Sequence, residues 1–463
     1  MLQVELPPGF SEERRYALHV VLTTFLGVEH RVAQGSAGSV CLRAGRDNSV
    51  RVADVFLRRA ATAWLAPSSL PVLPLAEFAL DSVPFPVKAL TRTLPIVYGE
   101  SVSEGRFIAV TNGAVQLGID IFGTAFFFLS RYEELVTRER DARDRFPAAA
   151  SFAARANLFE RPIVDEYVEL LWSALVHAFP WLERRKRVYA VAPSHDVDHP
   201  FMGKETQARA LANAVLDIAV QRDPALAFDR LHTQLAGATL RSSRDPHDRF
   251  DFIMDQSERH GLTSTFHFIA RSGSRSVDAS YALDDARTAG LMRKIHARGH
   301  RIGLHPSYDC YLDGMATRED ASHLRNTAAG LGIEQTEWTT RQHYLRFRAP
   351  ATWQHLADAG LDRDSTLAFH DRVGFRCGTC HEFPVFNLET KRMLALREQP
   401  LIVMEVACLK YMRLDLERCV ELSTRLARAC RLFDGTFELL WHNTTLLTRR
   451  QQASYVELLS AVC

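Results

Sequence analysis

The sequence predicts an α/β protein in which a parallel sheet closes into a distorted (β/α) barrel, preceded by a smaller α+β domain. Apolar, strand-like runs alternate with helical segments from residue 186 to residue 463. This alternation is typical of a parallel sheet, and its length suits a barrel. The whole chain has 463 residues and is 47% hydrophobic. This length is too great for one ordinary hydrophobic core and favours two domains.

The first 185 residues differ from the rest and predict a separate accessory domain. We expect a helix near 11–27, short strands near 39–43 and 50–52, and a helix that begins at Pro162. The run 120–134 is apolar on nearly all sides, so we interpret it as a packed helix rather than a ligand site. The basic run 184–187 marks the boundary, and we interpret it as a solvated linker.

The second domain, residues 186–463, reads as strands and helices in turn. Its helices are expected at 245–260, 282–298, 318–330, 353–360 and 414–432, and a polar, Ala-rich helical insertion is expected over 203–244. Its strands are expected at 188–192, 263–270, 301–305, 344–348, 401–406 and 436–441.

Composition excludes several classes of protein. A net charge of +1 gives no basic surplus for nucleic acid. The eight cysteines are scattered, which fits a reducing compartment. We find no secretion signal at the start and no run of about 20 apolar residues that could span a membrane. These features together predict a cytoplasmic protein.

Asp196 and Asp198 follow the predicted strand 188–192 and are two residues apart. In an extended chain both carboxylates point to the same side, where a divalent cation would relieve their repulsion. The alternative is a solvated loop whose aspartates cap the next helix. His305, Arg348 and His442 follow other predicted strands, so at the carboxyl edge of a barrel all five side chains would converge. That convergence favours a metal-dependent active site.

Four motifs that contain these residues, together with one strand, resemble the NodB-type polysaccharide deacetylases (carbohydrate esterase family 4) in order and spacing. They are Ser194-His195-Asp196-Val197-Asp198, the run 299–309 with His305 and Asp309, Phe347-Arg348-Ala349-Pro350, Leu440-Trp441-His442, and the strand at 261–266. The resemblance covers roughly 186–463. The N-terminal module with Leu129-Ser130-Arg131-Tyr132-Glu133-Glu134 also resembles the domain that precedes such barrels in a bacterial surface-polysaccharide subgroup.

The resemblance implies a barrel that holds one divalent ion, usually zinc, and removes an acetyl group from an N-acetylated sugar or glycan intermediate. It makes Asp196 the general base, Asp198 and His305 metal ligands, Arg348 the partner that orients Asp196, and His442 the general acid. These roles agree with what amide hydrolysis requires, an activated water and two groups that move protons.

The sequence departs from the family where a second metal histidine is usual, because Asp309 stands there. An aspartate can bind zinc, and an Asp-His-Asp site would be richer in oxygen, which would shift its preference toward other divalent ions. Alternatively Asp309 faces away, and water or another side chain, such as His199, His267 or His300, completes the site. Both alternatives stay open.

The resemblance also suggests a substrate-side loop over 364–383, and we expect Pro350, Asp364, Phe375 and Trp441 to contact the sugar. We interpret Cys377-Gly378-Thr379-Cys380 as a turn with two incidental thiols, since no second pair lies at zinc-site spacing. Two rival functions remain. One is a catalytically inactive barrel that binds a glycan or a protein, and the other is a metal amidohydrolase for a small amide.

Overall fold

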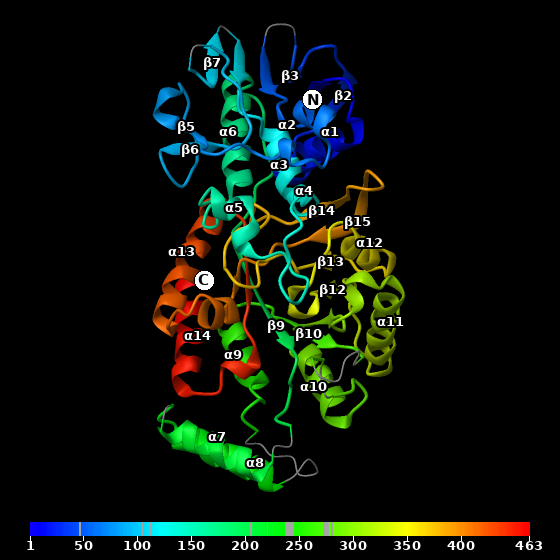
Figure 1. The fold of residues 1–463 in the computed structure, drawn as a ribbon, viewed down its shortest axis with the longest axis vertical. Helices are drawn as coiled ribbons and strands as arrows, with labels where there is room; N and C mark the ends of the chain where they lie inside the picture. The colour runs from blue at the N-terminus through cyan, green and yellow to red at the C-terminus, as the bar shows by residue number, and fades with distance from the viewer. Residues whose placement is uncertain are drawn as a thin grey trace.

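The computed structural model describes residues 1–45, 48–103, 105–111, 113–203, 206–219, 221–236, 245–271, 277–278 and 281–463. Figure 1 shows an elongated molecule with the N-terminal sheet at one end and the second sheet in the middle. All strands of the N-terminal sheets lie within residues 2–117, and all strands of the second sheet lie within 190–440.

The N-terminal domain is built on a mixed six-stranded sheet in the order β2-β1-β3-β4-β8-β7. Its strands are β1 (Leu2–Leu6), β2 (His30–Gln34), β3 (Ser39–Arg43), β4 (Ser49–Ala53), β7 (Ile108–Thr111) and β8 (Ala114–Leu117). β5 (Ala76–Ala79) and β6 (Thr93–Ile96) form a separate antiparallel pair. The strands predicted near 39–43 and 50–52 are confirmed as β3 and β4.

Helices cover this sheet and lead toward the second domain. They are α1 (Ser11–Leu18), which continues as the π-helix η1 (His19–Leu26), α2 (Phe56–Ala63), α3 (Ile121–Leu129), α4 (Tyr132–Val136), α5 (Phe152–Arg155) and α6 (Ile163–Ala178). Short 3-10 turns are η2 (Pro67–Ser69), η3 (Leu80–Ser82) and η4 (Ala148–Ala150). Every residue of α3 is buried, as its all-round apolar sequence predicts, and α3 packs against α1 and α6.

The second domain contains a nine-stranded sheet in the order β14-β15-β13-β12-β11-β10-β9-β17-β16, parallel throughout except between β14 and β15. Its strands are β9 (Ala190–Val197), β10 (Thr265–Ile269), β11 (Arg301–His305), β12 (Thr339–Thr340), β13 (Arg363–Asp364), β14 (Phe383–Asn387), β15 (Arg392–Glu398), β16 (Val403–Met404) and β17 (Thr436–Leu440). The predicted parallel α/β sheet is therefore present.

The strand order follows the chain from β9 to β13 and continues with β15 and then β14, while β17 and β16 lie on the other side of β9. The edge strands are β14 and β16, so a barrel of this order would have its seam between them. Within the described part of the sheet no strand pairing bridges that seam, so closure of the predicted barrel is not confirmed. The carboxyl ends of the parallel strands still meet at one edge, which is what gathers the site residues.

Two predicted strands differ from the structure. The run 344–348 is not a strand, because Tyr344 and Leu345 adopt positive φ values of 60° and 55° in the 3-10 turn η6 (His343–Leu345). The strand at this place is β12, which lies a few residues earlier. The run 401–406 contains only the two-residue strand β16.

Helices flank the second sheet. They are α9 (Phe250–Arg259), α10 (Ala286–Ala297), α11 (Gly314–Gly330), α12 (Ala351–Asp358), α13 (Leu416–Leu432) and α14 (Arg449–Val462), with the short turns η5 (Cys310–Leu312) and η8 (Asn443–Thr445) and the π-helix η7 (Ala407–Tyr411). Among the described residues, no helix combines the length and the apolar character that crossing a bilayer requires.

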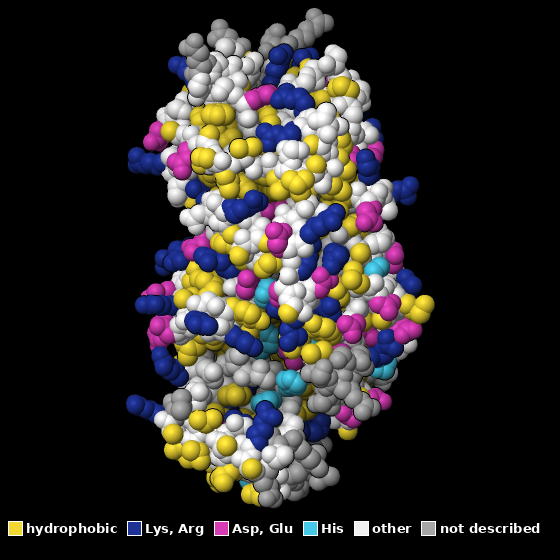
Figure 2. Space-filling model, viewed as in Figure 1, with side chains coloured by type: hydrophobic (Ala, Val, Ile, Leu, Met, Phe, Trp, Pro, Cys, Tyr) yellow, Lys and Arg dark blue, Asp and Glu magenta, His cyan; other side chains and the backbone are white. Residues whose placement is uncertain are grey.

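The helical insertion predicted over 203–244 is present as a helix pair, α7 (Gln207–Ala219) and α8 (Pro224–Ala236), which contact each other. Residues 204, 205, 220 and 237–244 of the predicted insertion lie outside the described part of the chain. Figure 1 shows the pair at the end of the molecule opposite the N-terminal sheet. Hydrophobic side chains gather on it in Figure 2, and they include Leu211, Val215, Ile218 and Phe228.

The two domains are joined by a buried ion-pair network. The Glu134 carboxylate lies 2.8 Å from both the Arg131 and the Arg376 guanidinium, and all three side chains are at most 3% exposed. Burial alone would raise the pKa of Glu134, but the two guanidinium groups hold it below its usual value. The buried ion pair between Glu134 and Arg376 therefore helps to hold the two domains in one relative position.

The segment 364–383 packs against the N-terminal domain instead of a substrate. Phe375 N donates to Phe159 O at 2.8 Å, and Cys380 N donates to the Asp165 carboxylate at 2.9 Å. Cys377 and Cys380 are buried free thiols. The expected substrate-side loop is therefore part of the domain interface.

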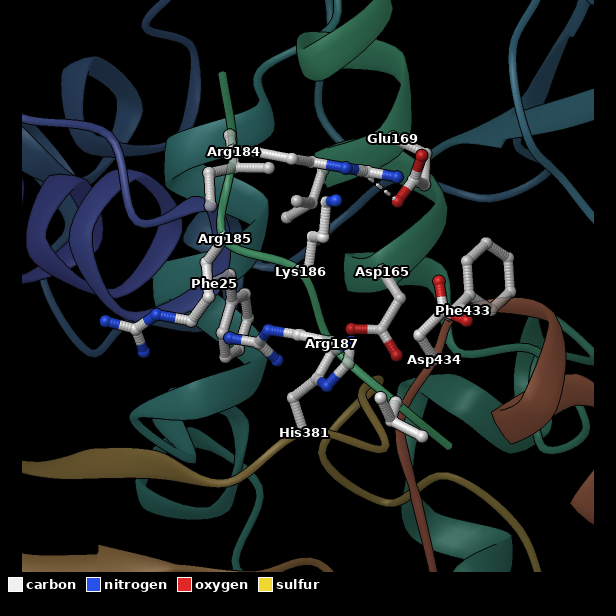
Figure 3. A pocket seen from close by; sticks show the side chains of 13 residues that line it. Phe25, Asp165, Glu169, Arg184, Arg185, Lys186, Arg187, His381, Phe433 and Asp434 are labelled. Atoms are coloured by element: carbon white, nitrogen blue, oxygen red, sulfur yellow. Dashed lines mark hydrogen bonds and ion pairs between the residues drawn. The ribbon is translucent and has the colours of Figure 1, made fainter. Parts of the chain in front are cut away.

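The basic run 184–187 also belongs to this interface and is not simply a solvated linker. Figure 3 shows it along a cavity of about 340 Å³ whose lining includes Asp165 and His381. Arg184 pairs with Glu169 at 2.6 Å. All four basic residues line this cavity, and the Arg184 and Arg185 side chains extend to opposite sides in the same view.

Candidate metal centre

The site is organised by β9, which carries two aspartates to the carboxyl edge of the sheet. Asp196 lies within β9, which ends five residues later than predicted, and Asp198 follows its last residue. His305 is the last residue of the neighbouring-but-one strand, β11. His343 comes shortly after β12, in the turn η6. The parallel order of these strands brings all four side chains to one place.

Asp198, His305 and His343 form a group that could hold a metal ion, since one ligand atom from each lies within 4.8 Å of the others. Asp198 Oδ1 is 3.3 Å from His305 Nε2 and 3.6 Å from His343 Nε2. Two imidazoles and one carboxylate are a common ligand set for zinc in an open, catalytic site.

The second nitrogen of each imidazole is already engaged, so that Nε2 is directed at Asp198. His305 Nδ1 lies 2.6 Å from the Arg341 carbonyl oxygen, and His343 Nδ1 lies 3.0 Å from Asp278 Oδ1. Such partners set the tautomer and the orientation of metal-binding histidines. Among the described residues, Asp198 Oδ1 is buried without a hydrogen-bond partner of good geometry. The three side chains therefore fit a divalent ion.

Asp309, the third ligand suggested by the sequence, does not join this group. Its side chain is 74% exposed and pairs with Arg346 at 3.1 Å. Asp309 leads into the turn η5, which directs its carboxylate to the surface, while His343 fills the third position. The structure thus supports the alternative in which Asp309 faces away, although none of the three histidines suggested from the sequence replaces it.

Asp196 is held by an arginine, but that arginine is Arg341 and not Arg348. Arg341 is fully buried and donates to Asp196 Oδ1 at 3.1 Å, to Ser194 Oγ at 2.9 Å and to Glu438 Oε1 at 2.9 Å. Burial would raise the pKa of Asp196, but His305 and the Arg341 guanidinium hold it well below its usual range. Asp196 is therefore an ionised carboxylate next to the metal group.

Arg348 points away from the site and pairs with Asp144 of the N-terminal domain at 2.6 Å. The misplaced strand 344–348 explains the wrong sequence assignment, because it put Arg348 at a strand end. Behind Asp196 lies His267 of β10, which the sequence suggested only as an alternative metal ligand, and its Nδ1 is 3.4 Å from Asp196 Oδ1. Burial lowers the pKa of His267 to about 4, so it supports Asp196 as a neutral ring.

His442 lines the same cavity as Asp196 and lies beside Asp198. Its Nδ1 is 2.7 Å from Glu405 Oε1, and its Nε2 is 3.8 Å from Asp198 Oδ2. Burial would lower the pKa of His442, but the Glu405 carboxylate outweighs it and raises the pKa to about 10. The sequence did not select Glu405, which lies just after the short strand β16. His442 is therefore held as an imidazolium that can donate a proton.

These groups open into a cavity of about 200 Å³, which we call the metal-centre cavity. It is lined by Arg145, Asp196, Asp198, His305, His343, Tyr344, Leu345, Met404, Val406, Lys410, Tyr411, His442 and Thr444. In Figure 2, histidine side chains appear in the middle of the face in view, bordered by Lys and Arg side chains.

None of the four residues expected to contact the sugar lines this cavity. Asp364 and Trp441 are fully buried, Phe375 is 1% exposed, and Pro350 is buried before α12. Asp364 faces Thr366 and Glu398 in the interior, where burial raises its pKa to about 6. All four are packing residues.

The N-terminal domain reaches the site through residues 137–147, which we call the covering segment. Asp144 in this segment accepts hydrogen bonds from Arg348 at 2.6 Å and from Tyr311 at 2.6 Å. Arg145 in the same segment donates to the Tyr344 carbonyl oxygen at 3.3 Å. These contacts attach the covering segment to the rim of the metal-centre cavity.

We expect Asp144→Ala to destabilise the chain by about 1 kcal/mol or less, because Asp144 and its partner Arg348 are both partly exposed to solvent. The same change should raise KM more than it lowers kcat, since it loosens the covering segment without touching the metal group. Urea unfolding and steady-state kinetics measure the two effects. Asp81→Ala is a suitable control, because Asp81 forms only a surface pair with Arg92 at 3.7 Å. An equal KM change in the control would contradict the expectation.

Comparison with known proteins adds distant likenesses. The model of a family of unknown function (DUF7033) matches residues 2–180. No curated protein matches the chain. A Mycobacterium smegmatis protein assigned as a polysaccharide deacetylase is similar in structure, with 18% identity and a TM-score of 0.38 over 60% of this chain and 85% of that one.

Two other solved structures illustrate the range of similar proteins. A family 4 carbohydrate esterase from Streptomyces lividans, in complex with acetate, has 10% identity and a TM-score of 0.28 over 60% of this chain and 88% of that one. A family 4 pseudoenzyme from Bacillus anthracis has 8% identity and a TM-score of 0.31 over 60% and 61%. The function proposed next rests on the geometry of the metal centre itself.

Proposed function

We propose that the chain is a metal-dependent hydrolase that removes the acetyl group from an N-acetylated sugar. The observation that carries this proposal is the combination at one cavity of a metal-binding group, a carboxylate held by arginine and an imidazolium held by glutamate. They are Asp198, His305 and His343, then Asp196 with Arg341, and His442 with Glu405. Amide hydrolysis needs each of these three parts.

Asp198, His305 and His343 would hold the ion. A divalent metal bound there supplies Lewis acidity for the amide carbonyl and for the attacking water. Asp196 Oδ2 lies 3.9 Å from His305 Nε2, so it can accept the proton that the water loses. Arg341 and His267 keep Asp196 ionised and oriented for that transfer.

His442, whose Nε2 is 3.8 Å from Asp198 Oδ2, is placed to complete the reaction. When the C–N bond of the amide breaks, its nitrogen needs a proton, and His442 Nε2 can donate it. Glu405 stabilises the charged ring before the transfer and fixes Nδ1, so that Nε2 is directed into the cavity. An acid and a base beside one metal group suit a hydrolase better than a binding protein.

A sugar substrate is supported by the resemblance of the strand-end motifs and by the shape of the cavity. A volume of about 200 Å³ is small compared with the roughly 300–1,000 Å³ of common ligand sites. It would accept an acetamido group and part of one ring, with the remaining glycan outside. The rings of Tyr344 and Tyr411 on its wall suit the faces of a sugar.

The test measures acetate release from N-acetylated sugars and glycans by the zinc-loaded chain, by the chain after chelation, and by the chelated chain after zinc is restored. We expect release to stop on chelation and to return with zinc. Asp196→Asn should retain the metal and lose acetate release. Acetate release that continues without metal would contradict the proposal, as would metal binding with no release from any N-acetylated substrate.

A further inference from the structure

One wall of the metal-centre cavity carries positive charge, and part of this charge comes from the N-terminal domain. Arg145 of the covering segment and Lys410 of η7 both line the cavity. On the basis of the deacetylase function proposed above, we propose that the substrate carries a phosphate or a carboxylate beside its N-acetyl group. Arg145 and Lys410 bind this anion while the acetamide faces the metal group.

Arg145 is fixed in position before any ligand arrives. Its side chain is only 7% exposed, and it donates to Asp141 Oδ2 at 2.9 and 2.7 Å and to the Tyr344 carbonyl oxygen at 3.3 Å. A guanidinium has five N–H donors, and these contacts use three of them. A preordered guanidinium with remaining donors is well suited to a phosphate or carboxylate oxygen.

Lys410 and Arg143 add cations that no carboxylate neutralises within the described part of the chain. Lys410 is exposed, and its ammonium lies 6.0 Å from the centre of the Tyr411 ring. The Arg143 guanidinium stacks on the Tyr344 ring at 4.1 Å, on the far side of a residue that lines the cavity. Both therefore contribute positive potential toward the cavity mouth.

The carboxylates around this wall are already engaged. Asp141 pairs with Arg145, Asp144 pairs with Arg348, and Asp309 pairs with Arg346. Lys410 and Arg143 are therefore left as cations without a carboxylate partner in the described part of the chain, and a neutral glycan would not compensate them.

Other residues of the cavity lining differ in chemistry. Leu345, Met404 and Val406 are apolar and suit the methyl group of an acetyl substituent. An N-acetylated sugar with a neighbouring anion matches both the cationic and the apolar lining, and a neutral N-acetylated sugar matches only the apolar part. The covering segment, and with it the N-terminal domain, would therefore act in the selection of the substrate.

The test compares three probes by calorimetric binding to the metal-free chain: N-acetylglucosamine, N-acetylglucosamine 1-phosphate, and a disaccharide of N-acetylglucosamine with glucuronic acid. We expect at least one anionic probe to bind about tenfold or more tightly than the neutral probe, and the preference to weaken as salt is raised. Lys410→Gln and Arg145→Gln should each reduce the preference. Lys294→Gln, the same change on the outer helix α10, should leave it unaltered.

The phosphate and the uronate probes separate the two sources of negative charge. Equal binding of neutral and anionic probes would overturn the inference, as would a preference that survives in both Lys410→Gln and Arg145→Gln. Because Lys410 is exposed, its replacement is expected to leave the fold intact. Binding is measured without metal and without turnover, so acetate release decides the proposed function separately. Acetate release without a preference for anions would reject only the inference made here.

Discussion

His343→Ala is expected to lower the affinity of the chain for zinc by more than about 100-fold and to abolish acetate release. Losing a residue that merely supports a metal ligand typically weakens binding by about 10- to 100-fold, and a ligand contributes more. His343 Nε2 is directed at Asp198 and its Nδ1 is engaged by Asp278. Competition with a chromophoric chelator measures the affinity of the purified variant.

Asp309→Ala is the matched control, because the sequence assigns the third ligand to Asp309 and the structure assigns it to His343. The Asp309 carboxylate is largely exposed, so its removal should change neither zinc affinity nor acetate release appreciably. His343→Gln, which preserves more of the side-chain volume, should follow His343→Ala. The opposite result, with zinc lost in Asp309→Ala and retained in both His343 variants, would reject the assignment.

Arg341→Met is expected to destabilise the chain by about 3–5 kcal/mol. It removes the cation between Asp196 and Glu438, whose side chains are 4% and 8% exposed, and leaves both carboxylates buried without this shared cation. Burial raises the pKa of Glu438 even with Arg341 present. The charged form of Glu438 is therefore already destabilised before the guanidinium is removed. Urea unfolding measures the change in the free energy of unfolding.

Two further variants make this prediction specific. Arg348→Met removes a cation that is 40% exposed and should therefore reduce the free energy of unfolding by no more than about 1 kcal/mol. Adding Glu438→Gln to Arg341→Met removes one of the two buried carboxylates and should restore part of the stability. Similar effects for Arg341→Met and Arg348→Met would show that Asp196 is not oriented by Arg341.

Local sequence patterns were enough to predict the residues that follow clear strands. Asp196, Asp198, His305 and His442 each lie at the end of an apolar run whose burial the sequence indicates, so their neighbourhood follows from parallel strand order. The same patterns failed between residues 339 and 348. β12 has only two residues, which is too short to produce any alternation, and the nearby run 344–348 resembles a strand although positive φ values at Tyr344 and Leu345 prevent it.

That single misplaced strand accounts for two assignments. It put Arg348 at a strand end, which favoured Arg348 over Arg341. It also left His343 just before the predicted strand, where no site residue was expected. Local signal was also missing for Glu405 and for the place of His267 beside Asp196, because each acts only through a partner that is distant in the sequence. Burial of Phe375 and Trp441 depends on the packing of whole domains, and an aromatic residue beside a site looks the same in the sequence whether it faces ligand or core.

The sequence by itself determined that this chain is an α/β protein with an accessory domain, with a pair of aspartates on a strand and histidines at two other strand ends. Those features depend on periodicity and on spacing, which are local. Only the tertiary structure decided that His343 completes the metal group, that Arg341 holds Asp196, and that Arg145 reaches the cavity from the other domain. Each of these depends on contacts between residues far apart in the chain, set by loop conformation and domain packing, which no local pattern encodes.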